Sequence, residues 1–117
     1  MRLEFVLLIY RLRTDILNNA INEPGWFILD VRNPNELERD GSIKATNWAN
    51  IPEANVEEKI SQIPNNVKIV VHCKSGSNGG RSSRAAELLK SKGYDAEFYP
   101  GGYFRWKDNF TATTLPL

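Results

Sequence analysis

The sequence combines one nucleophile with a loop rich in glycine and basic residues. Cys73 is the only cysteine, and seven residues separate it from Arg81. Those seven residues and the one after Arg81 are small, polar or basic: Lys74, Ser75, Gly76, Ser77, Asn78, Gly79, Gly80 and Ser82. A backbone of this kind can turn several N–H groups toward one point, and such a nest at the start of a helix binds anions.

This arrangement predicts a nucleophilic cysteine in an anion-binding loop. Lys74 and Arg81 add positive charge at the two ends of the loop, so we expect an accessible Cys73 in which the thiolate is favoured over the thiol. Such a thiolate can take up sulfur as a persulfide, or it can attack the phosphorus or arsenic of an oxyanion. The alternative is an inert, buried cysteine beside a glycine turn, but this segment is poor core material.

Composition and charge exclude several other classes of protein. The 117 residues suffice for one compact domain, and 15 Lys and Arg against 14 Asp and Glu give a net charge of +1. We therefore expect neither nucleic acid nor a membrane as a partner. One cysteine cannot form an internal disulfide, and Cys73 with the single histidine, His72, gives too few ligands for a structural zinc site. We expect no metal and no cofactor.

Strand and helix patterns alternate along the chain, which predicts an α/β fold with a parallel sheet. The expected strands are residues 5–9, 27–31, 67–71 and 97–99, and the expected helices are residues 16–21, 35–39, 56–63 and 83–92. Thr14 or Asp15 is expected to cap the first helix, and Ser82 or Ser83 the last. Parallel sheets place their sites at the carboxyl ends of strands, which is where the Cys73 loop begins.

Several segments together resemble the rhodanese-like domain family over about residues 10–108. They are residues 28–32 with Glu36, residues 43–47, 51–52, 70–82 and 83–94, and the pair Gly101-Gly102 with Trp106. The resemblance implies a single three-layer domain over residues 1–117, with a central, mostly parallel sheet of about five strands and helices on both faces. Residues 1–9 are then an extra N-terminal segment.

The resemblance implies a sulfurtransferase of the thiosulfate sulfurtransferase type. Cys73 would attack a small anionic donor, thiosulfate or a persulfide, carry the sulfur as a persulfide, and pass it to cyanide, a thiol or a protein acceptor. Lys74 to Ser82 would form the anion-binding loop, with Lys74 and Arg81 guiding the donor. Asp30 and Arg32, at the end of a neighbouring strand, would either touch the substrate or form an ion pair that holds the strand end against the loop.

The loop is longer than in the family's sulfurtransferases and in its phosphatase and arsenate reductase branch, so two alternatives stay open. One is a phosphatase or arsenate reductase with an enlarged oxyanion loop, and the other is a non-catalytic binding or regulatory module. We expect His72 to be structural or to face solvent. The aromatic residues are expected mostly in the core and at its rim; if any of them is functional, Tyr103 and Trp106 would be the ones that border the pocket mouth. We also expect a monomer or weak dimer in the cytoplasm rather than the periplasm, because no cleavable signal is recognised.

Overall fold

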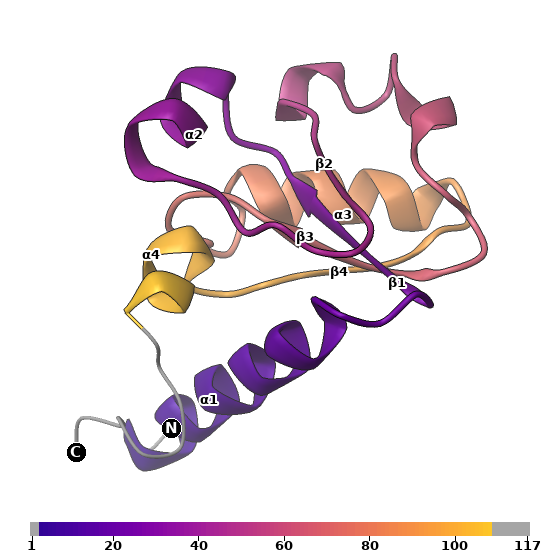
Figure 1. Ribbon diagram of the computed structural model, residues 1–117. Helices are drawn as coiled ribbons and strands as arrows, with labels where there is room; N and C mark the ends of the chain where they lie inside the picture. The colour runs from indigo at the N-terminus through magenta and orange to yellow at the C-terminus, as the bar shows by residue number, and fades with distance from the viewer. Residues whose placement is uncertain (1–2, 109–117) are drawn as a thin grey trace.

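A parallel sheet of four strands forms the centre of the fold (Figure 1). The computed structural model describes residues 3–108. The strands are β1 (Trp26–Asp30), β2 (Trp48–Asn50), β3 (Lys68–His72) and β4 (Asp95–Phe98), in the order β2-β1-β3-β4. The register pairs Asp30 with His72 on one side and with Asn50 on the other, so these three residues meet at the carboxyl edge of the sheet.

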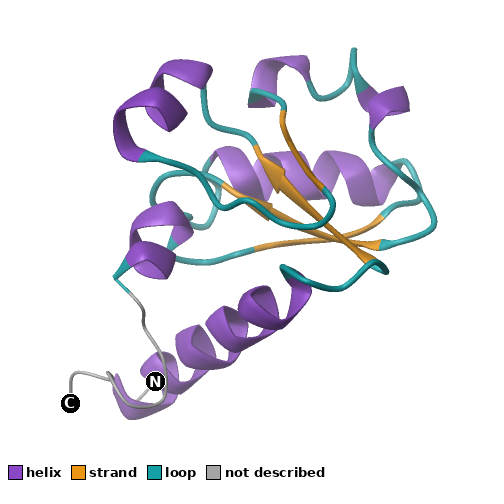
Figure 2. Ribbon diagram, viewed as in Figure 1, coloured by secondary structure: helices purple, strands orange, loops and turns teal. Residues whose placement is uncertain are grey.

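Helices cover both faces of this sheet, which gives three layers (Figure 2). The helix α3 (Arg81–Ser91) and the 3-10 helices η1 (Glu53–Asn55) and η2 (Ile60–Gln62) lie on one face; α1 (Leu3–Ala20) and α4 (Gly102–Lys107) lie on the other. The remaining helix, α2 (Pro34–Asp40), follows β1 beyond the carboxyl edge. Because side chains alternate along a strand, Leu29 and Val71 pack toward α3, while Ile28 and Val70 pack toward α1. The α/β fold predicted from the sequence is confirmed, with four strands instead of about five.

The prediction of a buried strand over residues 5–9 is wrong, because this segment lies within α1. The start of the helix at Thr14 or Asp15 is wrong as well: Thr14 is a buried residue in mid-helix, and its hydroxyl lies 2.6 Å from that of Tyr99. Phe5 and Ile9 are exposed. The run of residues 5–9 is apolar throughout and too short to distinguish a strand from a helix, whereas the later part of α1 has an apolar face that packs on the sheet. None of the helices in residues 3–108 has the length and hydropathy required to span a bilayer.

The helix expected over residues 56–63 is also wrong, since η1 and η2 occupy this region with a turn between them. The apolar spacing was nevertheless informative. Val56 and Ile63 are buried against the α3 face, and Ile60 packs beside them. Two tight turns closed by bonds from Val56 N–H to Glu53 O and from Ile63 N–H to Ile60 O present the same side chains as a regular helix would.

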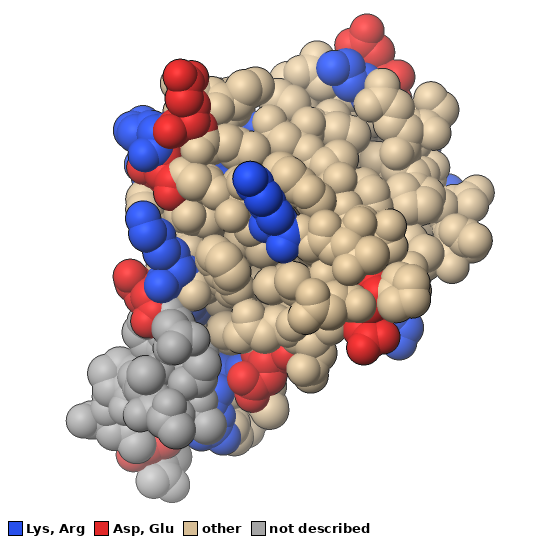
Figure 3. Space-filling view, viewed as in Figure 1, with Lys and Arg blue, Asp and Glu red and all other residues tan. Residues whose placement is uncertain are grey.

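Charged side chains of both signs share the surface. On the face shown in Figure 3, basic residues lie next to acidic ones at several places along the margin of the molecule. This agrees with the near-neutral net charge of +1. Positive potential must therefore be created locally, by particular side chains and backbone groups.

Candidate functional site

Cys73 leaves the carboxyl end of β3 and lies between the sheet and α3. Cys73 is only 3% exposed, so the prediction of an accessible thiol is wrong. The Sγ atom is 3.3 Å from Oγ of Ser82. The prediction that Ser82 or Ser83 caps α3 is wrong. Both serines are buried in the first turn of the helix, and Gly80 is the residue before the helix.

The first half of the loop is bound to α4 through its carbonyl groups. Cys73 O accepts a hydrogen bond from Tyr103 N–H at 2.8 Å, and Lys74 O accepts one from Phe104 N–H at 3.4 Å. Gly76 O accepts a third, from Gly101 N–H, at 3.4 Å. A trans peptide unit carries its C=O and N–H on opposite sides. The amide groups that follow these carbonyls therefore point away from α4; they belong to Lys74, Ser75 and Ser77.

Two glycines make this close contact possible. A Cβ atom on Gly102 would lie 2.5 Å from Lys74 O and 2.7 Å from Cys73 O. A Cβ atom on Gly76 would lie 2.5 Å from Gly101 N. Both glycines also have positive φ angles, +63° at Gly102 and +62° at Gly76, which other residues rarely adopt. Gly76 and Gly102 thus serve backbone packing between the loop and α4.

The second half of the loop turns toward the start of α1. Gly80 N–H donates to Ser77 O at 2.9 Å, which closes a turn over Asn78 and Gly79. A cavity of about 350 Å³ separates this turn from α1. Its lining residues are Val6, Ile9, Tyr10, Gly76, Ser77, Asn78, Phe98 and Pro100. The lengthened loop and the extra N-terminal segment therefore lie on opposite walls of one cavity.

The start of α3 supplies further free donors next to Cys73. The bond from Arg84 N–H to Gly80 O is the first of the helix. Gly80 has no side chain to cap the earlier amide groups, so the N–H groups of Arg81, Ser82 and Ser83 have no partner within the helix. These groups carry the positive end of the helix dipole. Together with the loop amides, they give this site the capacity to bind an anion.

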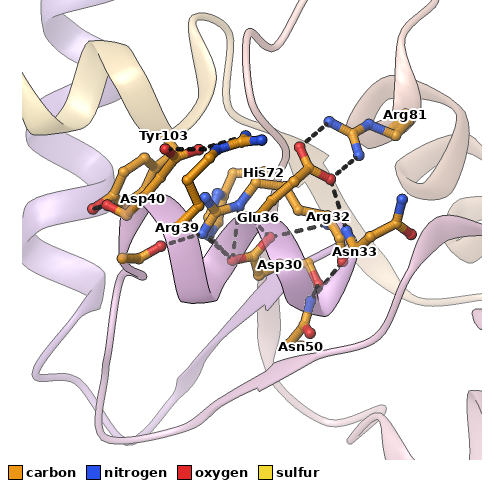
Figure 4. Close-up of polar contacts among 11 residues, drawn as sticks. Asp30, Arg32, Asn33, Glu36, Arg39, Asp40, Asn50, His72, Arg81 and Tyr103 are labelled. Atoms are coloured by element: carbon orange, nitrogen blue, oxygen red, sulfur yellow. Dashed lines mark hydrogen bonds and ion pairs between the residues drawn. The ribbon is translucent and has the colours of Figure 1, made fainter.

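Arg81 forms an ion pair with a carboxylate, whereas the sequence suggested that it guides the anionic sulfur donor. Its guanidinium donates to both oxygens of Glu36, at 2.6 and 3.0 Å (Figure 4). Glu36 also accepts a 2.9 Å bond from Asn33 N–H at the start of α2. The hydrogen bonds from Arg81 lower the pKa of Glu36 from its ordinary value of 4.5 to about 2, although burial opposes the shift. The ion pair thus joins α2 to the end of the loop.

We predict that Glu36→Gln destabilises the protein in a pH-dependent way. A carboxyl group whose pKa is lowered on folding adds stability above pH 4.5 and loses it as the pH falls through about 2. Since one pKa unit corresponds to about 1.4 kcal/mol, the difference from wild type is expected to reach about 3 kcal/mol at neutral pH. Urea unfolding between pH 7 and pH 2.5 measures it.

The control for this prediction is Glu38→Gln, which removes an exposed carboxylate from the same helix. We expect it to change the free energy of unfolding by less than about 0.5 kcal/mol. A stability difference between Glu36→Gln and wild type that stays constant from neutral pH to pH 2.5 would contradict the prediction.

Asp30 and Arg32 form a buried ion pair below the loop. Arg32 donates to the two carboxylate oxygens of Asp30, with the shortest contact at 2.6 Å, and both side chains are fully buried. Arg32 also donates to Gly41 O at 2.9 Å, and its guanidinium lies 4.3 Å from the ring centroid of Tyr103. Of the two roles expected for this pair, the structure shows the ion pair that anchors the end of β1.

His72 is buried next to this pair, so the expectation that it faces solvent is wrong and the structural alternative holds. Its Nε2 atom is 3.8 Å from an oxygen of Asp30, and its side chain is fully buried (Figure 4). Burial lowers the pKa of His72 below its ordinary value of 6.5, although Asp30 raises it. Because adjacent residues of a strand face opposite sides, His72 and Cys73 belong to different layers of the core.

Two aromatic residues of α4 pack against neighbouring elements. Tyr103 is buried over Arg32, and its hydroxyl donates to Asp40 O at 2.8 Å. Trp106 donates from Nε1 to Asn18 on α1 at 2.9 Å. These contacts place Tyr103 in the core and Trp106 against α1, in agreement with the expected positions in the core and at its rim. Phe104, which lies between them in the sequence, is 38% exposed. The centroid of its ring is 5.6 Å from Nζ of Lys74.

Sequence reasoning also missed the acidic partners of the site. In the sequence, Glu36 stands out only as part of a motif, and nothing marks Glu53 as the partner of Arg84. The partners of the two ion pairs are 45 and 31 residues apart in the sequence, so no local sequence pattern connects them. Within residues 3–108, no three histidine, cysteine or acidic residues are grouped in a way that could hold a metal ion.

Most of the described chain matches a known family. The rhodanese-like domain family matches residues 13–109, so the chain belongs to the rhodanese-like domains. A rhodanese-related protein from Thermoplasma volcanium is 28% identical, with 85% of this chain and 90% of that chain covered and a TM-score of 0.68. No curated protein matches this chain significantly.

Two further solved structures are related in fold. An NAD-dependent persulfide reductase from A. fulgidus is 27% identical over 75% of this chain, with a TM-score of 0.56, and this chain spans only 17% of that longer protein. The single domain sulfurtransferase RDL2 of Saccharomyces cerevisiae is 22% identical, with 89% of this chain and 92% of that chain covered and a TM-score of 0.62. The structural neighbours thus include a persulfide reductase and a single domain sulfurtransferase.

Proposed function

We propose that the protein is a sulfurtransferase that carries sulfane sulfur on Cys73. The observation that carries the proposal is the direction of the loop amides: the carbonyls of Cys73, Lys74 and Gly76 bind α4, which turns the opposite N–H groups away from it. The outer sulfur of a persulfide is anionic, and amide donors at the start of a helix stabilise negative charge. Membership of the rhodanese-like family and similarity to a persulfide reductase support this chemistry.

The reaction consists of two substitutions at sulfur. In the first, the Cys73 thiolate attacks the outer sulfur of the donor, thiosulfate or a persulfide; a new S–S bond forms while the donor's S–S bond breaks, and the electron pair leaves with sulfite or a thiolate. In the second, cyanide or an acceptor thiolate attacks the outer sulfur and releases the Cys73 thiolate. Since the chain has no second cysteine, the sulfur must leave to another molecule.

The test is a mass measurement of the intact protein after incubation with thiosulfate and, separately, with an organic persulfide. We expect a gain of one sulfur atom that cyanide removes. Cys73→Ser should not gain it, whereas Ser91→Ala, at an exposed position on α3, should load as wild type does. Absence of the adduct with every sulfane donor would refute the proposal. Turnover of an aryl phosphate that is lost in Cys73→Ser would establish the phosphatase alternative instead.

A further inference from the structure

The two arginines at the Cys73 loop are already held by carboxylates. Arg81 donates to both oxygens of Glu36, as described above. The guanidinium of Arg84 likewise donates to both carboxylate oxygens of Glu53, at 2.7 and 2.9 Å. It also donates to Gly79 O of the loop. A guanidinium bound by both oxygens of a carboxylate has one edge of its planar fork occupied. Its positive charge is largely compensated before any substrate arrives.

Both arginines lie at the loop itself: Arg81 follows it as the first residue of α3, and Arg84 donates to Gly79 O at 2.7 Å. The hydrogen bond to Glu36 is the main cause of the raised pKa of Arg81, and a negative charge on Cys73 raises it further. The same holds for Arg84, where Glu53 is the main cause and Cys73 contributes less. The carboxylates thus compete directly with an anion in the loop for these two cations.

Lys74 differs from the arginines. Its side chain is exposed, its Nζ atom lies 5.6 Å from the ring centroid of Phe104, and within residues 3–108 no carboxylate forms an ion pair with it. The charged side chains of the loop and of the ion pairs beside it are five cations and four carboxylates, a net charge of +1: Arg32, Arg39, Lys74, Arg81 and Arg84 against Asp30, Glu36, Asp40 and Glu53.

We propose that the donor is an organic persulfide, which brings at most one negative charge, and not the dianion thiosulfate. The inference rests on the proposed function. When the Cys73 thiolate meets thiosulfate, three negative charges gather in a site whose side chains offer a net charge of +1. A neutral hydropersulfide, R–S–SH, leaves only the thiolate charge to be balanced. Glu53 is then a specificity-determining residue, because it withholds Arg84 from a sulfonate group.

The transfer balances for this donor without another reactant. The Cys73 thiolate attacks the terminal sulfur of R–S–SH and forms the new S–S bond. The S–S bond of the donor breaks, and its electron pair leaves with R–S⁻. The proton of the transferred sulfur then passes to R–S⁻, which departs as the thiol and leaves an anionic persulfide on Cys73 for the loop amides to bind.

The experiment compares the rates at which Cys73 gains sulfur from thiosulfate and from 2-hydroxyethyl persulfide, whose organic group is uncharged. In wild type we expect the persulfide to load at least about 10-fold faster at equal concentration. Glu53→Gln frees Arg84 and should speed loading from thiosulfate about 10-fold, while loading from the persulfide changes less than about twofold. The matched control is Glu57→Gln, because Glu57 is also an acidic residue near η1 but pairs with Lys92 and not with Arg84.

Each result has a definite meaning. Thiosulfate loading as fast as persulfide loading in wild type would overturn the inference, and so would an unchanged donor ratio in Glu53→Gln. An equal rise in thiosulfate loading in Glu57→Gln would overturn the role of Glu53, since net charge alone would then explain the effect. Absence of loading from both donors would refute the proposed sulfurtransferase itself, and the inference with it.

Discussion

Replacing Arg32 with methionine is expected to lower the free energy of unfolding by about 3–5 kcal/mol. Arg32 and Asp30 are both fully buried, and the guanidinium is the partner of both carboxylate oxygens. Methionine fills much of the same volume but leaves the Asp30 charge without compensation, and an unpaired buried charge is far more costly than a lost surface pair. Denaturant unfolding at neutral pH measures the change.

Two comparisons show whether the buried charge is the cause. Arg39→Met removes an arginine that is 56% exposed and paired with Asp40, so we expect a loss below about 1 kcal/mol. The double variant Asp30→Leu/Arg32→Met removes both charges. Its loss in free energy of unfolding should be smaller than the sum of the losses in the two single variants. If Arg32→Met cost no more than Arg39→Met, the ion pair would not be the element that holds the end of β1.

Replacing Gly102 with alanine is expected to destabilise the protein by about 3 kcal/mol or more and to slow sulfur loading on Cys73. The new methyl group would lie 2.5 Å from Lys74 O and 2.7 Å from Cys73 O, and both are backbone atoms that cannot move aside alone. The positive φ of +63° adds strain of about 1–2 kcal/mol. Thermal unfolding and the sulfur-loading rate measure the two effects.

Gly93→Ala isolates the contribution of the backbone angle. Gly93 has a φ of +90°, yet no atom lies within 4 Å of the position of an added Cβ. We expect this variant to lose about 1 kcal/mol and to load sulfur at the wild-type rate. Equal losses in Gly102→Ala and Gly93→Ala would show that the loop can move away from α4, which would contradict the close packing between them.

The sequence predicted those elements whose apolar pattern is continuous and buried. The strand expected over residues 67–71 is β3, which begins and ends one residue later. The helix expected over residues 35–39 lies within α2, which has Asn33 as its N-cap residue and Pro34 as its first residue. The failures concern segments whose pattern fits two structures. The run of residues 5–9 is apolar on every side, so its periodicity could not separate a strand from the first turns of α1.

The candidate site was predicted in its central part and not in its surroundings. Cys73 and the glycines were visible because few backbones need three glycines between a strand and a helix. The ion pairs of Arg81 and Arg84 were not, because they depend on where α2 and η1 pack against α3. The burial of Tyr103 likewise depends on Arg32, which is 71 residues away in sequence but lies beneath its ring in space.

The hydrogen bonds between the Cys73 loop and α4 make this helix a reporter of the site. The N–H group of Tyr103 is bound to Cys73 O at 2.8 Å and is protected from solvent deuterium only while the loop stays in place. Any motion that lifts the loop from the thiol must expose this amide at the same time. Deuterium uptake at Tyr103 therefore measures how often the buried Cys73 sulfur becomes open to a donor, without a label on the cysteine itself.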